Sequence, residues 1–437
     1  MGSWPELTFK DAPIEIIDGD RGVNYPKKSD FFPIGHCIFL NAGNVTASGF
    51  RFSKVSFISR ERDLLLRKGK LEIHDIVLTT RGTVGNVGFF DESVNFDHIR
   101  INSGMVILRP DQSRIAPRFL YLFLKSHLFK TQVTALATGS AQPQLPIRDI
   151  SRIQISLPTI AEQLSIAGML GALDDKIELN RRMNETLEAL ARAIFKDWLV
   201  DFGPTRAKAE GCAPYLVPEL WDLFPDTLDE EGKPVGWSFD TLARLAVTNS
   251  ESWTARHHPR TVEYVDLSSA KWGNIEATAL LDWIAAPSRA RRIAKVGDTI
   301  VGTTRPGNGS FAYISRDGLT ASTGFAVLSP RRSMYRDTVY IAATSVENIE
   351  RLANLAEGHG GAYPAVKPNE VTDTVIVFPG DEVLASFADL VSPIREKIER
   401  AKAESRTLAE TRDLLLPKLM SGELRLAEAE KGLEAVA

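Results

Sequence analysis

Two hydrophobic patterns alternate along the chain. In residues 1–158 and 237–379, short runs of β-branched and aromatic residues are separated by Gly, Pro, Asn and Asp, which predicts mostly strands with some helix. In residues 159–202 and 380–426, apolar or small residues recur at alternating spacings of three and four, which predicts long helices. The pattern therefore predicts two β-rich domains, each followed by a long helix.

The remaining segments and some local features carry more specific predictions. Residues 203–236, rich in Pro and Gly, are interpreted as a linker with an apolar stretch that can dock, and residues 427–437 as a frayed tail. Residues 119–136 predict one helix inside the first β-rich domain. The glycines of residues 82–88 have the spacing GxxGxxG and are followed by β-type sequence, which favours a hairpin turn over a phosphate-binding loop.

The spacing of three and four is typical of a coiled-coil seam. Because a long β-rich domain separates the two seams, they can pair with each other as an antiparallel coiled coil. The first seam comprises Leu170, Leu173, Ile177, Asn180, Asn184, Leu187, Ala191, Ile194 and Trp198. The second comprises Phe387, Val391, Ile394, Ile398, Ala401, Ser405, Leu408, Arg412, Leu415 and Leu419.

The polar seam residues leave two interpretations open. Asn180 and Asn184 correspond to Ala401 and Ser405 on the second seam, and such residues can fix the register of a coiled coil at a cost in stability. Alternatively, they lie at the edge of a short bundle. Ser392 followed by Pro393 resembles an N-cap and a first helical residue, so we expect the second helix to begin again there.

The chain contains an internal repeat with an offset of about 220–224 residues. Four matches in the same order indicate a duplicated domain, and not a solenoid. The sequence thus predicts an α+β fold in which two β-rich domains of similar fold are separated by two long helices, with pseudo-twofold internal repetition. The matched segments are 76–82 (IVLTTRG) with 299–306 (TIVGTTRP), 102–110 (NSGMVILRP) with 322–330 (STGFAVLSP), 139–143 (GSAQP) with 360–364 (GGAYP), and 153–158 (IQISLP) with 374–379 (TVIVFP).

Composition and charge narrow the function. The 437 residues carry a net charge of −4, but the β-rich segments are neutral to basic and the helical segments acidic. There are 2 cysteines and 7 scattered histidines, which argues against a disulfide framework and a metal site. No apolar run approaches the length of a membrane span, and the first residues lack a signal-peptide pattern, so we expect a cytoplasmic protein that does not associate with membranes.

Signatures of catalysis are also missing from the sequence, which contains no GxxxxGK[ST], HExxH or GxSxG motif. This favours a binding module over an enzyme. Two half-sites one turn apart on DNA are separated by about 34–36 Å, and a helix over residues 173–199 is about 40 Å long at 1.5 Å per residue. Double-stranded DNA is therefore the expected target, read as two half-sites that differ in sequence.

The domain order and the motifs of the chain resemble those of the specificity subunits of type I restriction–modification systems. The resemblance covers nearly the whole chain, and its motifs are specific only in combination. They are residues 18–22 (DGDRG), 79–82 (TTRG), 157–163 (LPTIAEQ), 202–211 (FGPTRAKAEG) and 414–424 (LLLPKLMSGEL).

The resemblance implies a non-catalytic subunit with two target-recognition domains, each reading one half of an asymmetric, bipartite DNA sequence. It further implies helices that set the spacer between the half-sites and that dock two DNA adenine methyltransferase subunits. A translocating endonuclease subunit would join that assembly. S-adenosylmethionine, ATP and magnesium would then be bound by the partners, and no cofactor by this chain.

Candidate DNA contacts are side chains that can reach base edges or phosphates, although each segment can also be a solvated or purely structural surface. Residues 18–28 combine donors with an aromatic ring, and the recurrence of Arg81 as Arg305 argues for a phosphate contact or a structural role. The second domain has no segment that aligns with residues 18–28. The candidates are Arg21, Asn24, Tyr25, Lys27, Lys28, Arg81, Gln142 and Gln144 in the first domain, and Arg256, His258, Arg260, Arg291, Arg292, Arg305 and Tyr363 in the second.

Two other classes of function remain as alternatives. A scaffold whose duplicated domains bind protein or peptide would show no salt-dependent affinity for duplex DNA, whereas phosphate contacts give a steep dependence on salt. An enzyme would require a cluster of ionisable residues that the sequence does not reveal.

Overall fold

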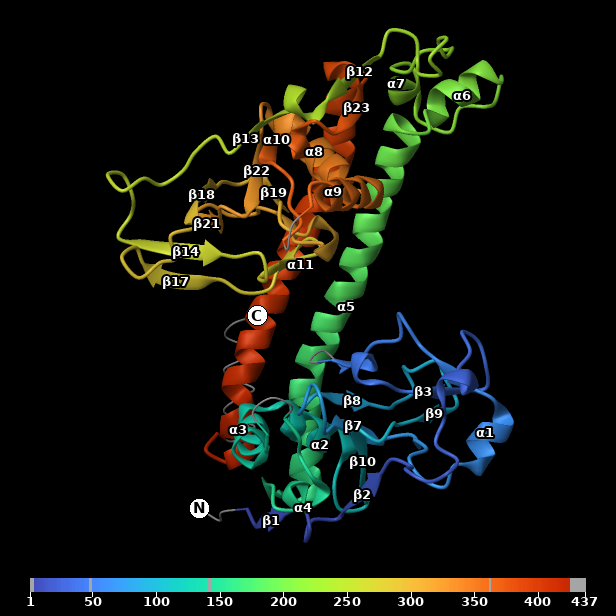
Figure 1. The fold of residues 1–437 in the computed structure, drawn as a ribbon, viewed down its shortest axis with the longest axis vertical. Coiled ribbons are helices and arrows are strands. Elements are labelled where there is room, and N and C mark those ends of the chain that lie inside the picture. The colour runs from blue at the N-terminus through green and yellow to red at the C-terminus, as the bar shows by residue number, and fades with distance from the viewer. Residues whose placement is uncertain (1–3, 47–48, 140–142, 361–362, 425–437) are drawn as a thin grey trace. The chain divides into compact units, whose positions relative to one another are not determined.

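The computed structural model describes residues 4–46, 49–139, 143–360 and 363–424. The chain divides into two compact units (Figure 1). Unit 1 consists of residues 1–179 and 404–437, and unit 2 of residues 180–403. Two long helices, α5 (Ile160–Leu199) and α11 (Asp381–Ser421), each begin in one unit and end in the other.

The β-rich part of unit 1 is built around a four-stranded antiparallel sheet in the order β2-β10-β7-β8, with a second sheet in the order β6-β3-β9 and a short pair of β1 with β11. The strands are β1 (Glu6–Thr8), β2 (Ile14–Asp18), β3 (Cys37–Phe39), β4 (Val45–Thr46), β5 (Gly49–Phe50), β6 (Phe57–Ile58), β7 (Ile76–Thr79), β8 (Val87–Phe89), β9 (Ile99–Arg100), β10 (Met105–Pro110) and β11 (Gln154–Ser156). The shorter helices are α1 (Arg60–Leu65), α2 (Pro117–Lys125), α3 (His127–Leu136) and α4 (Ile147–Ile150).

Unit 2 repeats this plan with the sheet order β13-β22-β19-β20, a second sheet in the order β17-β14-β21-β18, and a pair of β12 with β23. The strands are β12 (Ser238–Thr241), β13 (Ala246–Thr248), β14 (Thr261–Val265), β15 (Ala270–Lys271), β16 (Asn274–Ile275), β17 (Ala279–Asp282), β18 (Ala290–Ala294), β19 (Thr299–Gly302), β20 (Phe311–Tyr313), β21 (Leu319–Ser322), β22 (Phe325–Pro330) and β23 (Val375–Phe378). The shorter helices are α6 (Gly203–Ala209), α7 (Pro218–Trp221), α8 (Arg336–Ala343), α9 (Val346–Gly358) and α10 (Pro368–Thr372).

The central strands are buried on both faces, and their alternating side chains enter two different cores. In β7, Ile76 and Leu78 join the core that includes α2 and the long helices of unit 1, whereas Val77 joins the core beneath the second sheet. In β19, Val301 and Ile300 divide in the same way between the two cores of unit 2. Two of the repeated motifs, 76–82 with 299–306 and 102–110 with 322–330, therefore contain the central strands of two matching sheets.

The long helices pair antiparallel within each unit. In unit 1, Arg412 of α11 forms an ion pair of 2.6 Å with Asp174 of α5. In unit 2, Asn180 Nδ2 donates to the carbonyl oxygen of Ala401 over 3.4 Å, and farther along α5 the ring centroid of Phe195 lies 5.9 Å from that of Phe387. The partner's number falls as the α5 number rises, which confirms the predicted antiparallel coiled coil and the α+β fold class.

The predicted helix-pairing residues differ in how deeply they are buried. The buried members of the two seams are Leu170, Leu173, Asn180, Ala191, Trp198, Phe387, Val391, Ile398, Ala401 and Leu419, and the others are partly buried. Asn184 is partly buried, and its side-chain oxygen is enclosed without a hydrogen-bond partner in the part of the chain that the structure describes. Ala401 lies 221 positions after Asn180 and is its counterpart in the repeat. The two equivalent residues therefore contact each other.

Two predictions about helices are wrong. The predicted single helix over residues 119–136 is two helices, α2 and α3, because Ser126 leaves the helical conformation and its hydroxyl caps α3 by accepting from Phe129 N. The second long helix does not begin again at Ser392, since α11 continues through Pro393. Burial of Val391 and Ile398 on either side stabilises the helix there, and the Ser392 hydroxyl donates to Asp337 over 2.7 Å and does not act as a cap.

The segment predicted to be a linker packs against the core of unit 2. The ring of Phe224 lies 5.1 Å from that of Trp198 on α5 and 6.1 Å from that of Trp237, and all three side chains are buried. The predicted turn at residues 82–88 is a hairpin, since β7 and β8 pair antiparallel on either side of it. No helix among the described residues is long and apolar enough to cross a membrane.

Candidate nucleic-acid interface

The two units differ most in their second sheets. In each unit this sheet contains a parallel pair, β3 with β9 in unit 1 and β14 with β21 in unit 2. Unit 2 adds the edge strand β18, where unit 1 has only an isolated bridge between Lys70 and Arg100. The loop between β13 and β14 takes the place of the loop between β2 and β3. The structure thus supplies a counterpart of residues 18–28 that sequence alignment does not reveal.

Trp283 brings the two predicted basic clusters of unit 2 together. Its ring stacks on His258 with centroids 4.3 Å apart and planes 7° apart. The Arg291 guanidinium carbon lies 4.3 Å from the centroid of the same indole ring. The backbone N–H of Trp283 donates to the carbonyl oxygen of Arg260 over 2.9 Å. We call His258, Arg260, Trp283 and Arg291 the Trp283 cluster.

A β-bulge determines how Arg291 is presented. β18 pairs with β21 through Ala290 opposite Ser322 and Arg292 opposite Ala321, so Arg291 is the additional residue between them. A bulge locally bends the strand and redirects the side chain of the additional residue. Arg292 is half-buried, and its Nη1 donates to the Ser252 hydroxyl over 3.0 Å, which favours a structural role for that residue.

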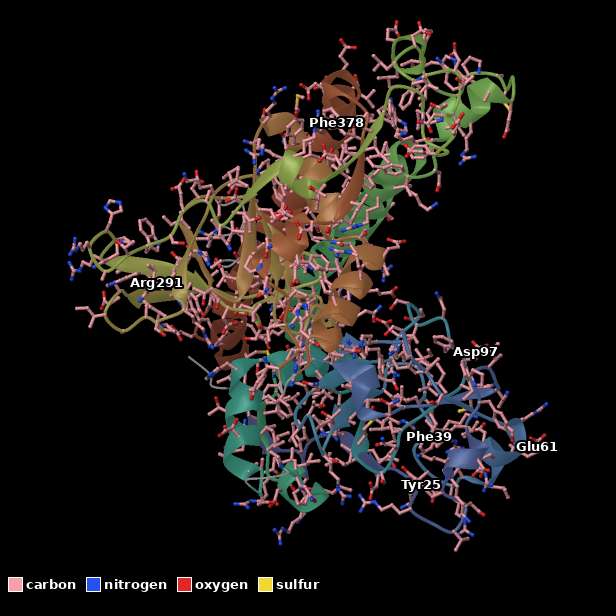
Figure 2. The ribbon with its side chains drawn as sticks, turned by 45° about the horizontal axis from the view of Figure 1, so that its top comes forward. Tyr25, Phe39, Glu61, Asp97, Arg291 and Phe378 are labelled. Carbon is pink, nitrogen blue, oxygen red and sulfur yellow. The ribbon has the colours of Figure 1, made fainter. Side chains whose placement is uncertain are left out.

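The remaining candidates of this loop are exposed. Arg256 lies in a turn closed by the backbone N–H of Thr254, which donates to the carbonyl oxygen of His257 over 3.0 Å. Figure 2 shows Arg291 at the end of unit 2 that is remote from Phe378. The candidate contacts of unit 2 on this sheet therefore gather at one end of the unit.

In unit 1, several of the candidates have structural roles. Arg21 forms an ion pair of 3.1 Å with Asp18, and Asn24 Nδ2 donates to the Leu65 carbonyl oxygen over 3.4 Å. The Tyr25 ring packs edge-on against Phe39 with centroids 5.6 Å apart. Both residues are labelled in Figure 2. The aromatic ring of this loop therefore contributes to packing beneath it.

Lys27 and Lys28 remain exposed at the end of the same loop. The loop is fastened by Asp20, whose carboxylate accepts hydrogen bonds from the backbone N–H groups of Gly22 and Arg67, each over 2.8 Å. These two hydrogen bonds lower the pKa of Asp20. The fastening places residues 67 and 68 beside the predicted loop.

A second pair of candidate positions is equivalent in the two units. Arg81 and Gln144 face each other in a short antiparallel bridge. In unit 2, Arg305 N donates to the carbonyl oxygen of Pro364, and the Arg305 guanidinium carbon lies 5.4 Å from the ring centroid of the exposed Tyr363. The structure brings together the turns that the sequence predicts to be related. Gln142 lies outside the described residues.

Sequence reasoning missed Trp283 and Lys68. Trp283 lies among ordinary strand residues, and nothing in its local pattern indicates that two other segments meet on its ring. Lys68 is exposed and corresponds to Arg291 in the repeat. Lys68 precedes the buried Asp75 by seven residues, and Arg291 precedes the buried Asp298 by the same number. The offset of the repeat was the signal that could have found it.

The described residues contain no group of three or more His, Cys, Asp or Glu side chains that could hold a metal ion. Their arrangement instead presents guanidinium, amine, amide and aromatic groups at loop surfaces. Such groups can contact phosphates and base edges.

Comparison with known proteins agrees with this geometry. The family model described as "Type I restriction modification DNA specificity domain" matches residues 22–189. The HindI specificity subunit of Haemophilus influenzae is 24% identical over 97% of this chain and 100% of its own length. The MjaIX specificity subunit of Methanocaldococcus jannaschii is 24% identical over 81% of this chain and 78% of its own.

A solved structure supports the fold. The S subunit of a type I restriction–modification system from M. genitalium aligns with a TM-score of 0.54 at 16% sequence identity, over 95% of this chain and 96% of that one. In sequence the chain is therefore similar to the specificity subunits of type I restriction–modification systems, over residues 22–189 in the family model and over most of its length in the two relatives.

Proposed function

We propose that the chain is the DNA sequence-recognition subunit of a type I restriction–modification complex. Each β-rich region reads one half of an asymmetric, bipartite target. The observation that carries the proposal is the repeated sheet order, β2-β10-β7-β8 and β13-β22-β19-β20, combined with loops that diverge between the units. A shared scaffold with different reading surfaces suits a target with two unlike halves.

The proposal extends to the partners. Two methyltransferase subunits dock on the helices α5 and α11, and an endonuclease subunit joins the complex. The chain itself performs no catalysis, and S-adenosylmethionine, ATP and magnesium are bound by those partners. In support of docking, the helical segments are acidic in sequence and can receive a partner of complementary charge.

The test is to express the chain with its methyltransferase partner and to map adenine methylation across a genome by single-molecule sequencing. We expect a split motif, with two short unlike halves around a fixed gap. Random methylation, or none despite a stable complex, would contradict the proposal.

A protein scaffold remains the second candidate, because nothing in a duplicated fold requires DNA. The two candidates differ in their response to salt. A DNA-reading complex binds duplex DNA with an affinity that falls steeply as salt rises, since phosphate contacts release counterions. Affinity that is absent, or insensitive to salt, would favour the scaffold.

A further inference from the structure

We propose that Arg291 reads a guanine in the half-site of the second recognition domain, and that Trp283 holds it in the conformation for doing so. The inference rests on the proposed function and deepens it, because it names a residue that determines sequence specificity and the base that it selects.

The chemistry of Arg291 matches guanine. A guanidinium group presents two parallel N–H donors that fit the O6 and N7 acceptors of guanine in the major groove. Such a contact requires a fixed plane and free donors along one edge. Stacking on the indole of Trp283 fixes the plane. Nη1 donates to the Ala290 carbonyl oxygen over 3.0 Å, which leaves Nε and Nη2 available.

The charge of Arg291 determines which ligands it can accept. Arg316, in the loop before β21 of the same sheet, pairs with Glu263 of β14. Among the described residues, Arg291 forms no ion pair with a carboxylate. Its positive charge is therefore not neutralised within unit 2, and it is available to an electronegative ligand such as the O6 and N7 edge of guanine.

The surroundings of Arg291 reduce the entropic cost of binding. A free arginine loses side-chain freedom when it is immobilised at an interface. Here the bulge at residues 290–292 directs the side chain, and the ring that it covers is itself stacked on His258. The side chain is half-buried and already held by these contacts without DNA, which favours a selective contact over a mobile phosphate contact.

Exposed Arg256 serves as the matched comparison. It lies on the neighbouring loop, carries the same charge, and is not part of the aromatic stack. An exposed arginine of this kind contacts phosphates, which contributes affinity without sequence information. Arg256→Gln and Arg291→Gln therefore remove the same charge from neighbouring segments but differ in the expected effect on the motif.

The experiment uses the complete complex with its methyltransferase partner. Methylation is mapped on a genome, and its rate is then measured on duplexes that carry each of the four bases at every position of the second half-site. For the wild type we expect one position that requires a G·C pair. In Arg291→Gln, discrimination at that position falls about 5- to 150-fold, and the first half-site is unchanged.

Two further variants define the mechanism. Arg291→Lys keeps the charge but cannot form the bidentate contact, so it relaxes the same position and remains informative if Arg291→Gln does not assemble. Trp283→Leu removes the stack and relaxes that position in part. Arg256→Gln lowers methylation at all sequences equally and leaves the motif intact.

The outcomes separate this inference from the proposed function. A wild-type motif that is split, but unaltered by Arg291→Gln and Arg291→Lys, would overturn the role of Arg291 and leave the proposed function in place. Uniform weakening in Arg291→Gln, with a smaller dependence on salt, would show a phosphate contact and also overturn it. A wild-type complex without any split motif would overturn both.

Discussion

In both units, ion pairs join the β-rich region to the long helices, but their polarity is inverted between unit 1 and unit 2. In unit 1, Asp174 on α5 lies 3.6 Å from Lys125 at the end of α2 and 2.6 Å from Arg412 on α11. In unit 2, the residue 221 positions later is Arg395 on α11, which lies 3.3 Å from Asp337 on α8 and 2.6 Å from Glu188 on α5.

The inversion extends to the helix that packs on the coiled coil. Ser126 and Ser345, which cap the next helix in each unit, lie 219 positions apart. With this offset, Tyr121 matches Tyr340, but Arg118 matches Asp337. Arg118 pairs with Asp175 of α5, so in unit 1 the β-rich region supplies the base and the helix the acid.

This difference shows how two copies of one fold can remain distinct within one chain. The central strands are similar enough to form matching sheets, so apolar packing alone would not separate them. Exchanging the β-rich regions would place Arg118 at the position of Asp337, beside Arg395, and Asp337 at the position of Arg118, beside Asp175. Like charges at a partly desolvated contact cost free energy. The ion pairs therefore favour the pairing of each region with its own helix segment.

The largest expected effect comes from breaking the buried anchor. Arg395→Met leaves Glu188 and Asp337 without their shared cation, and we expect a loss of about 3–5 kcal/mol in the unfolding free energy of unit 2. The Arg395 side chain is only 3% exposed, whereas that of Arg412 is 19% exposed, so Arg412→Met should cost less. Hydrogen exchange measured separately in α8 and α2 checks this, and an equal or greater loss in α2 would contradict the comparison.

Reversing the polarity of one anchor sharpens the comparison. Asp337→Lys and Arg395→Glu each place like charges together, whereas the double variant restores one oppositely charged pair in the arrangement of unit 1. We expect a favourable coupling of about 1–3 kcal/mol between the two substitutions in a double-mutant cycle of denaturant unfolding. Additive losses would show that the two charges do not act on each other. Because Glu188 also pairs with Arg395, the cycle is repeated in a Glu188→Gln background, which removes this third charge.

The units also differ in the residue that holds a second buried aspartate. Buried Asp75 is held by Arg109, whose Nε and Nη2 donate to its carboxylate over 2.8 and 2.7 Å, whereas the repeat counterpart of Arg109 is Ser329, 220 positions later. Arg109→Ser should lower the unfolding free energy of unit 1 by about 1–3 kcal/mol, because the carboxylate loses a charged donor. Thermal unfolding measures this, with Arg148→Ser, whose side chain is 84% exposed, as a matched surface control.

The smallest effect concerns pH. Burial raises the pKa of Asp298, so the folded protein holds this proton more tightly than the unfolded chain, whose carboxyl titrates near 3.8. The contribution to stability is therefore greatest below that value and is lost as pH rises through the folded pKa. Relative to the wild type, Asp298→Asn should become more stable as pH rises from acid to neutral. Urea midpoints across this range provide the measurement, and a constant difference would contradict it.

The fold was largely predictable because its signals are periodic or repeated. The seam residues and the four repeated motifs are properties of the sequence alone, and they predict the helices and the central strands. The break at Ser126 was not predictable from hydrophobic period, since apolar spacing continues across it. The continuation through Pro393 was not predictable either, because burial on both sides outweighs the missing N–H of proline.

The candidate site was predictable only in part. The basic residues of unit 2 could be named from the sequence. Their contact with Trp283 could not, because the loop with His258 and Arg260, the segment with Trp283 and the strand with Arg291 meet only in the folded sheet. In unit 1, Asn24 and Tyr25 have the chemistry of base contacts, yet the structure uses them to hold a loop and to pack on Phe39. Residue type indicates what a side chain can contact, and tertiary packing determines whether it is free to do so.

The division of the chain into units has a consequence for its synthesis. Unit 2 is continuous in sequence, whereas the core of unit 1 requires Leu416, Leu419 and Met420, which are translated more than 200 residues after most of that core. During synthesis the N-terminal part of unit 1 leaves the ribosome first. The residues of unit 2 are nevertheless complete first, so unit 2 can fold before unit 1. The domain that is made first is thus completed last, and until then its apolar surface depends on chaperones or remains open to aggregation.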